Sequence, residues 1–364
     1  MTLAGLRTRE GYRLVEIEWP NRKAMIWARD RTAMPRVFCL EDNYEETAKT
    51  LGAVQKRLFD NMRTATRSRK GRKPRRPARL LNGYYDFTTM EQCSPSAALI
   101  LASYYDVVRS VQGWDIPLIE VARWSPNVRS LLHEIGFFDL LELKPTSTSP
   151  LTRSIKLVEF RTGAVVARED ASDLTETLAN MLVSTVPGID LTGDVGRSFM
   201  QLFGALQEAT ENTCDHAYKG MDIAPNMKRW WITGAIDAEK RHMTLAVYDN
   251  GWTIPATLRN WEQYGWIQRR LARARQMLNF RGEEEELDGV KMRLAMDVPR
   301  SSTGMSHRGK GFPAFKFVVE QSRSARLRIL SRRGEFIYEK GKRPQARALK
   351  TALNGTLVEW DLWL

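Results

Sequence analysis

The alternation of apolar and polar residues along the first part of the chain predicts one strand and one helix. Residues 12–19 (YRLVEIEW) alternate with the period of two that is typical of a half-buried strand. Between Asn43 and Met62, small and apolar residues recur with helical spacing, which predicts an amphipathic helix. This N-terminal α/β segment, residues 1–62, indicates no function by itself.

Two similar units follow, each a strand, a Ser-Pro pair and a helix. The first has a β-like stretch at 80–90 and a helix from Ser94-Pro95 through Val108. The second has a strand at 116–122 and a helix that Ser125-Pro126 opens and that ends near Gly136. Serine is a good N-cap, and proline fits the first helical position because the missing N–H is not needed there. The two units predict a small βαβα sheet domain over residues 80–150.

The second half of the chain, residues 151–364, predicts a mixture of helices and hairpins. Its periodicity changes between two and 3.6 residues, with Gly and Asn at the turns. The expected elements are a hairpin at 155–168 around Thr162-Gly163, helices at 172–183, 194–218 and 312–321, paired strands at 229–238 and 242–249, and closing strands at 325–339 and 355–363.

Composition places the chain among globular proteins. It has 364 residues, of which 43% are hydrophobic and 27% charged, enough for two or three domains with their own cores. No apolar run approaches the length of a membrane span, and the N-terminus lacks a secretory core. Three cysteines show no metal-type spacing. We therefore expect a cytoplasmic protein with reduced thiols.

The formal net charge of +13 attracts polyanions, and part of it is concentrated in residues 63–79 (RTATRSRKGRKPRRPAR), which contain no acidic residue. Composition favours a solvated linker, because basic segments that bind single strands usually interleave aromatic residues for stacking. A nucleic-acid contact through Arg67–Arg79 remains the alternative.

Polar residues on the helix predicted at 194–218 indicate candidate chemistry. Glu208, Asn212 and His216 are spaced by four residues and so share one face of that helix. An amide oxygen can ligate Mg²⁺, and a neighbouring carboxylate can deprotonate a water or hydroxyl. This spacing alone is weak, since solvated polar residues often repeat in the same way.

Three further motifs follow in a fixed order. A predicted strand ends in Asp249-Asn250-Gly251-Trp252-Thr253-Ile254-Pro255, the run HRGKGF (307–312) opens a helix, and Asn354-Gly355-Thr356 precedes the last strand. Glycines next to a helix N-terminus let the backbone approach phosphates, which the helix dipole also favours. Together with the helix bearing Glu208 and Asn212, this order resembles the N box and glycine boxes of the GHKL ATPase family, which includes histidine kinases, gyrase and MutL.

The resemblance implies a Bergerat-type domain over residues 151–364, with helices packed on one face of a mixed sheet, that binds ATP and Mg²⁺. It implies that Glu208 is the general base and Asn212 the Mg²⁺ ligand. Asp249 would accept a hydrogen bond from the adenine amino group, Gly251 would leave room for the base, and Thr356 would support the adenine side.

Gly309, Lys310 and Gly311 would wrap the phosphates. The family usually has a second glycine where Thr253 stands, so we expect the loop or the adenine pocket to be altered there. The stretch from Leu258 to Arg308 corresponds to the family's ATP lid. Its acidic run, Glu283–Glu286, is interpreted as solvated surface, with docking of the basic linker as the alternative.

Residues 80–150 resemble the STAS-like regulatory domains of bacterial signalling proteins. The resemblance lies in the stretches DFTTMEQCSPSAALILASYYD and SPNVRSLLHEIGFFDLL, in their hydrophobic pattern and helix starts. The whole chain is therefore predicted to be α/β (an α+β sandwich), with a basic linker and a STAS-like module before the ATP-binding domain.

Three functions remain open. No helical hairpin with an exposed phosphoacceptor precedes Ser172, which argues against an autophosphorylating histidine kinase; the four histidines are His133, His216, His242 and His307. We expect an ATP-hydrolysing or ATP-gated switch that controls a protein partner, such as a STAS-type regulator, with a homodimer left open. One alternative is a serine/threonine kinase resembling the anti-sigma-factor kinases, with Ser94 or Ser96 as phosphoacceptor rather than helix cap. The other is a nucleic-acid or protein-binding module with a degenerate nucleotide site.

Overall fold

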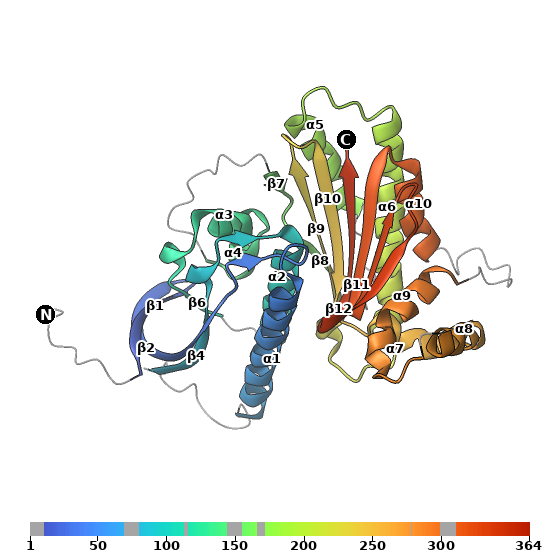
Figure 1. The fold of residues 1–364 in the computed structure, drawn as a ribbon. Coiled ribbons are helices and arrows are strands. Elements are labelled where there is room, and N and C mark those ends of the chain that lie inside the picture. Colours follow the sequence, from blue (N-terminus) through green and yellow to red (C-terminus); the bar gives the residue numbers. More distant parts are fainter. Residues whose placement is uncertain are drawn as a thin grey trace, which may run out of the picture. The chain divides into compact units, whose positions relative to one another are not determined.

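The computed structural model describes residues 11–68, 80–112, 116–143, 155–165, 172–277, 279–298 and 311–364. The chain divides into two compact units, Met1–Thr152 and Arg153–Leu364, and both contain helices and sheet (Figure 1). The expected α+β class is therefore confirmed. Across the described ranges, no helix combines the length and the apolar character that a membrane crossing requires.

A four-stranded sheet forms the first unit. Its strands are β1 (Arg13–Trp19), β2 (Arg22–Ala33), β4 (Leu80–Asp86) and β6 (Leu118–Ile119), in the order β4-β2-β1-β6. The hairpin strands β1 and β2 are antiparallel, and β4 runs parallel to β2. Because β2 and β4 share a ladder, the predicted N-terminal segment and the predicted second domain belong to one sheet. The two strands of the expected βαβα repeat, β4 and β6, are separated by β2 and β1.

The helices of the first unit follow the predicted pattern. They are α1 (Tyr44–Ser68), α2 (Pro95–Gln112), α3 (Pro126–Glu134) and α4 (Phe137–Leu140), with β3 (Val37–Phe38) and β5 (Gln92–Cys93) paired in parallel. Ser94 Oγ accepts a hydrogen bond from the Ala97 N–H at 3.3 Å, so its predicted role as N-cap is confirmed. Helix α1 continues through residue 68, into the predicted linker, whose residues 69–79 lie outside the described ranges.

A six-stranded sheet forms the second unit. Its strands are β7 (Ile155–Leu157), β8 (Arg161–Ala164), β9 (Arg229–Asp237), β10 (His242–Asp249), β11 (Ser324–Glu339) and β12 (Gln345–Trp363). The order is β11-β12-β10-β9-β7, with β8 also on β9. Every pairing in the described residues is antiparallel, so the expected mixed sheet was wrong. The expected hairpin at 155–168 was wrong too, because β7 and β8 pair with successive stretches of β9 and not with each other.

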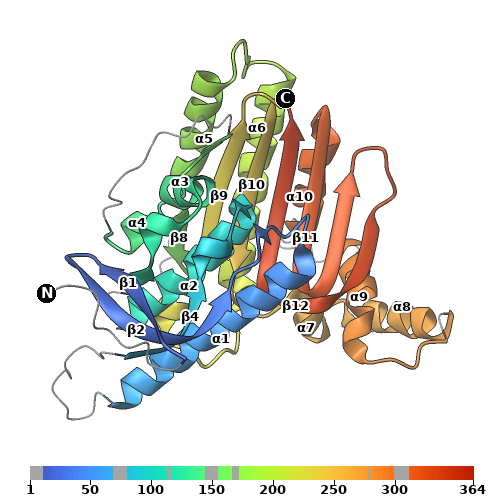
Figure 2. The same cartoon turned by 60° about the vertical axis from the view of Figure 1, so that its left-hand side comes forward.

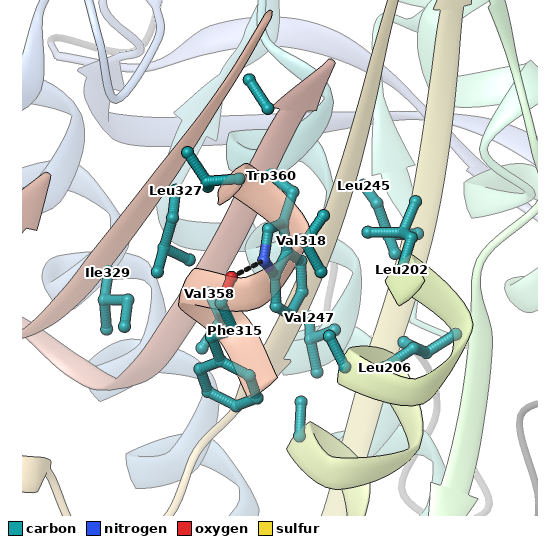
Figure 3. Close-up of a cluster of buried hydrophobic side chains, with 14 of the residues drawn as sticks. Leu202, Leu206, Leu245, Val247, Phe315, Val318, Leu327, Ile329, Val358 and Trp360 are labelled. Carbon is teal, nitrogen blue, oxygen red and sulfur yellow. Dashed lines mark hydrogen bonds between the residues drawn. The ribbon is translucent and has the colours of Figure 1, made fainter. Parts of the chain in front are cut away.

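One face of this sheet is covered by α5 (Ser172–Thr185), α6 (Asp194–Asn212) and α10 (Gly311–Gln321) (Figures 1 and 2). The alternate residues of β10 and β12 that point to these helices are apolar, as are the facing stripes of α6 and α10 (Figure 3). The buried Trp360 indole donates a hydrogen bond to the Phe315 carbonyl at 3.2 Å, which fixes α10 on β12. The core residues labelled there are Leu202, Leu206, Leu245, Val247, Phe315, Val318, Leu327, Ile329, Val358 and Trp360.

The region that resembles the family's lid contains α7 (Ile254–Thr257), α8 (Tyr264–Met277) and α9 (Asp288–Met296). Helix α9 packs closely against the β11–β12 hairpin: a Cβ on Gly289 would lie 2.5 Å from the carbonyl carbon of Arg347. The fully buried Asp288 carboxylate accepts two hydrogen bonds from the Arg332 guanidinium, at 2.5 and 2.7 Å. The C-terminal half of this insertion is therefore anchored to the sheet.

A pair of glycine substitutions tests this packing. Gly204 lies within α6 with open space where a methyl group would be added, so Gly204→Ala should raise the free energy of unfolding by about 1 kcal/mol. Gly289→Ala should instead lower it by about 1–3 kcal/mol, because the added methyl group collides with backbone. Urea unfolding of both variants measures the difference. Stabilisation by both substitutions would contradict the close contact of α9 with β12.

Candidate functional site

The candidate site is centred on the pair formed by the end of β10 and the neighbouring residue of β12. The antiparallel register places Asp249 directly opposite Thr356. Side chains in this relation have Cβ atoms about 4.5–5.5 Å apart. Both residues are nearly buried, each with 8% of its surface exposed. The structure thus brings together a carboxyl group and a hydroxyl group that the sequence had predicted at two separate motifs.

The environment of the Asp249 carboxyl group is unusual. Oδ1 accepts a hydrogen bond from the Gly251 N–H at 2.8 Å, and within the described ranges no donor reaches the second oxygen. Burial raises the pKa of Asp249 to about 7, and the single hydrogen bond from Gly251 only partly opposes that shift. The second oxygen is not one of the fully buried polar atoms that lack a partner in the described residues, so it keeps some accessible surface where water or a ligand can donate to it.

The loop after Asp249 packs closely against Ala217, at the end of the π-helical turn that follows α6. A Cβ on Gly251 would lie 2.3 Å from the Ala217 carbonyl oxygen, so glycine is required there. The neighbouring Trp252 N–H donates to that same oxygen at 2.6 Å, and its indole N–H donates to the Lys219 carbonyl at 3.1 Å. The loop therefore has a defined position relative to the polar face of α6.

The segment before Thr356 is equally constrained. Gly355 has a φ of +78°, in the left-handed region, and a Cβ there would lie 1.9 Å from the Asp249 carbonyl oxygen. Both conditions exclude larger residues. The Asn-Gly-Thr motif thus has a physical cause, since only glycine lets β12 approach the end of β10 while Thr356 faces Asp249.

The Thr253 backbone is unstrained. Its φ of −75° and ψ of 150° are ordinary extended values, which any residue adopts without strain. Its carbonyl oxygen accepts hydrogen bonds from the N–H groups of Ala256 and Thr257, at 3.0 and 3.1 Å, and so starts α7. The missing second glycine therefore costs no backbone strain.

Ser331 belongs to the site and was missed from the sequence. Its Oγ lies 2.8 Å from Thr356 Oγ1 and accepts a hydrogen bond from the Ile254 N–H at 2.8 Å. The side chain is fully buried. The available signal was its position: Ser331 continues the core-facing alternation of Ala325, Leu327 and Ile329 along β11, where an apolar residue is expected.

Glu208 and Asn212 lie one turn apart on α6, as predicted, and both are half-buried. The helix then changes to a π-helical turn over Thr213–Ala217. Because that turn shifts the periodicity, the predicted alignment of His216 with the other two is interrupted, and His216 is exposed. Of the three predicted residues, Glu208 and Asn212 therefore remain within the regular part of α6, and His216 does not.

The phosphate-binding motif is only partly described. Gly311 is the first residue of α10, as expected for a glycine at a helix N-terminus. Gly309, Lys310 and His307 lie outside the described residues. The basic residues Arg69–Arg79, the core of the alternative nucleic-acid contact, also lie outside them.

The structure also bears on two other sequence predictions, the acidic run Glu283–Glu286 and the serines proposed as phosphoacceptors. Glu284 lies 3.6 Å from Lys291, and Glu285 lies 3.4 Å from Arg333, with their side chains 63% and 44% exposed. The acidic run is therefore a mainly solvated surface that pairs with cations of its own unit. Ser96 is buried with 4% exposed, so a kinase cannot reach it in the folded unit, and Ser94 caps α2.

The expected Mg²⁺ ion would have to share its ligands between the protein and a bound molecule. The described part of the chain contains no group of three or more His, Cys, Asp or Glu side chains placed to hold a metal. Mg²⁺ commonly takes only one or two protein oxygens and completes its shell with phosphate oxygens and water. The Asn212 amide oxygen suits that role.

The raised pKa of Asp249 predicts a pH dependence of stability. Between about pH 4 and pH 7 the folded state binds this proton and the unfolded state does not, so the free energy of unfolding should fall as pH rises through that window. Three pKa units correspond to about 4 kcal/mol. Asp249→Asn should remove this part of the slope, as measured by urea unfolding at several pH values. Equal slopes in the two proteins would contradict a pKa of Asp249 that burial raises.

Comparison with known proteins gives no independent identification. No protein-family model matches the chain, and no curated protein matches it. The functional conclusion therefore depends on the residues and geometry described above.

Proposed function

We propose that residues 153–364 bind ATP with Mg²⁺, and that the protein is an ATP-hydrolysing or ATP-gated switch. The observation that carries this proposal is the Asp249–Thr356 pair: a carboxyl group that is 8% exposed, and that accepts one backbone hydrogen bond, lies opposite a hydroxyl group on the neighbouring strand. Adenine presents an amino donor beside a ring-nitrogen acceptor. The Asp249 carboxylate can accept from the amino group, and the Thr356 hydroxyl can donate to the ring nitrogen.

The phosphate end of the proposed site has two supports. Asn212, which is half-buried on α6, would supply an oxygen for Mg²⁺, and the helix N-terminus at Gly311 favours anions because its first N–H groups have no partner within the helix. Glu208, one turn before Asn212, is placed to act as general base toward a water or hydroxyl. The basic net charge of +13 attracts a polyanionic ligand to the protein.

The kinase, hydrolysis and gating functions differ in what happens to the γ-phosphate of ATP. Transfer to a protein serine would support the kinase alternative, although the burial of Ser96 and the capping role of Ser94 argue against these two residues as acceptors in cis. Anchoring of α9 by Asp288 and Arg332 limits any lid-like motion to other parts of the Leu258–Arg308 stretch. We therefore favour hydrolysis or gating, with a separate protein partner.

Nucleotide binding at this pair predicts base selectivity. Titration calorimetry should show that ATP binds more tightly than GTP, because guanine has a carbonyl where adenine has the amino donor. Asp249→Ala should weaken ATP binding by about 10- to 100-fold, the loss of one hydrogen bond to a charged group. Asp237→Ala, at a buried aspartate near the other end of β9, is the matched control and should leave affinity unchanged. Unaltered ATP affinity in Asp249→Ala would overturn the proposed base site.

Turnover separates the three functions. Incubation with γ-labelled ATP should release labelled phosphate, whereas label on protein supports a kinase and no turnover supports gating or a binding module. Glu208→Gln should reduce turnover by at least about 100-fold while ATP binding persists, since it removes the base but keeps the shape. Asn212→Ala should instead abolish the Mg²⁺ dependence of binding. Full turnover in Glu208→Gln would show that another group is the base.

A further inference from the structure

We propose that Ser331 is a positioning residue that orients the Thr356 hydroxyl as a hydrogen-bond donor toward the bound base. The site would then recognise adenine by its 6-amino group, which donates, and its N1 atom, which accepts. This inference rests on the proposed function of the site. It assigns a role to Ser331, which lies outside the sequence motifs. It also states which partner donates the hydrogen bond between Thr356 and the base, which the motifs do not define.

The geometry connects three parts of the chain through one hydroxyl group. Ser331 Oγ on β11 accepts the Ile254 N–H of the loop that follows Asp249, at 2.8 Å, and lies 2.8 Å from Thr356 Oγ1 on β12. Ser331 and Thr356 are direct cross-strand partners. On its other side Thr356 is the partner of Asp249, so these three residues form a row across β11, β12 and β10.

Each of the two hydroxyl groups has one proton and can therefore donate only one hydrogen bond, which we use to infer that Ser331 donates to Thr356. Ser331 is fully buried and already accepts from Ile254, so its own proton needs an acceptor, because an unused buried donor is costly. Thr356 Oγ1 is that acceptor. The Thr356 proton is then left for another partner, and Thr356 retains 8% exposure, which leaves it within reach of a ligand.

The result is a pair of groups of opposite polarity on adjacent strands. Ionised Asp249 accepts and Thr356 donates, which complements the 6-amino group and N1 of adenine, directly or through a water. Guanine presents a carbonyl and an N1–H at the same positions, the reverse pattern. Ser331 also holds the loop, since the Ile254 N–H would lose its acceptor without it.

A double-mutant cycle on the full-length protein tests this role. ATP affinity is measured by calorimetry at pH 8, above the pKa of Asp249, for the wild type, Ser331→Ala, Thr356→Val and the double variant. Ser331→Ala should weaken ATP binding by about 5- to 10-fold in the wild type and leave it unchanged in the Thr356→Val background. Selectivity for ATP over 1-deaza-ATP, which lacks the N1 acceptor, should fall in both single variants.

Ser322→Ala is the matched control, because Ser322 is a buried serine of the same unit whose hydroxyl donates to the Val318 carbonyl at 2.7 Å. It should change neither affinity nor selectivity. If Ser331→Ala does not fold, Ser331→Cys fills the position with a slightly larger side chain that is a weaker donor and should give an effect in the same direction. Amide hydrogen exchange without nucleotide should also show faster exchange at Ile254 in Ser331→Ala than in Ser322→Ala.

The outcomes distinguish this inference from the proposed function. If the wild type binds ATP but Ser331→Ala behaves like Ser322→Ala, or loses the same factor in both backgrounds, the role of Ser331 is overturned and the nucleotide site stands. If the wild type binds no ATP, the proposed function is overturned, and the role of Ser331 in reading adenine is overturned with it. Non-additive losses together with reduced selectivity support both.

Discussion

The antiparallel register between β10 and β12 is the constraint on which the candidate site depends. It places Asp249 opposite Thr356, and it holds only because Gly355 adopts a left-handed conformation in contact with the Asp249 carbonyl oxygen. A shift of β12 by one residue would turn Thr356 to the other face of the sheet, away from Asp249. The same shift would move Val358 and Trp360 out of the core. The free energy gained by burying these apolar side chains therefore also fixes the register at the site.

Burial also explains the chemistry of the pair. Burial at the end of β10 raises the pKa of Asp249 to about 7. A group held in this state costs stability in the free protein and can recover that cost when a ligand donates to it. The arrangement is typical of binding sites, where polar groups are kept in surroundings that do not satisfy them.

Much of this structure could be predicted from local sequence patterns. Helical spacing predicted α1, α2, α5, α6 and α10, and alternation predicted β9 and β10, because each buries one face on a core. Asp249 and Thr356 were predicted from the order of motifs that resembles the GHKL family, and the structure shows that Gly251 and Gly355 beside them make close backbone approaches. These features depend on residues near one another in the chain.

The features that were missed depend on distant residues. Ser331 matters because β11 pairs with β12 at Thr356 and because Ile254 reaches it from the loop after Asp249, neither of which leaves a local signal. The anchoring of α9 requires Asp288 to meet Arg332 across the insertion, and β7 and β8 pair with β9 although a local hairpin had been expected. The absence of strain at Thr253 likewise became evident only from its backbone conformation.

The most direct measurement is a crystal structure of the full chain with Mg²⁺ and a non-hydrolysable ATP analogue. We predict that the 6-amino group of adenine lies within hydrogen-bonding distance of the Asp249 carboxylate. We also predict that the ring edge faces Thr356 and that Mg²⁺ contacts the Asn212 amide oxygen. An adenine base bound elsewhere, with the Asp249 carboxyl group still unpaired, would contradict the account.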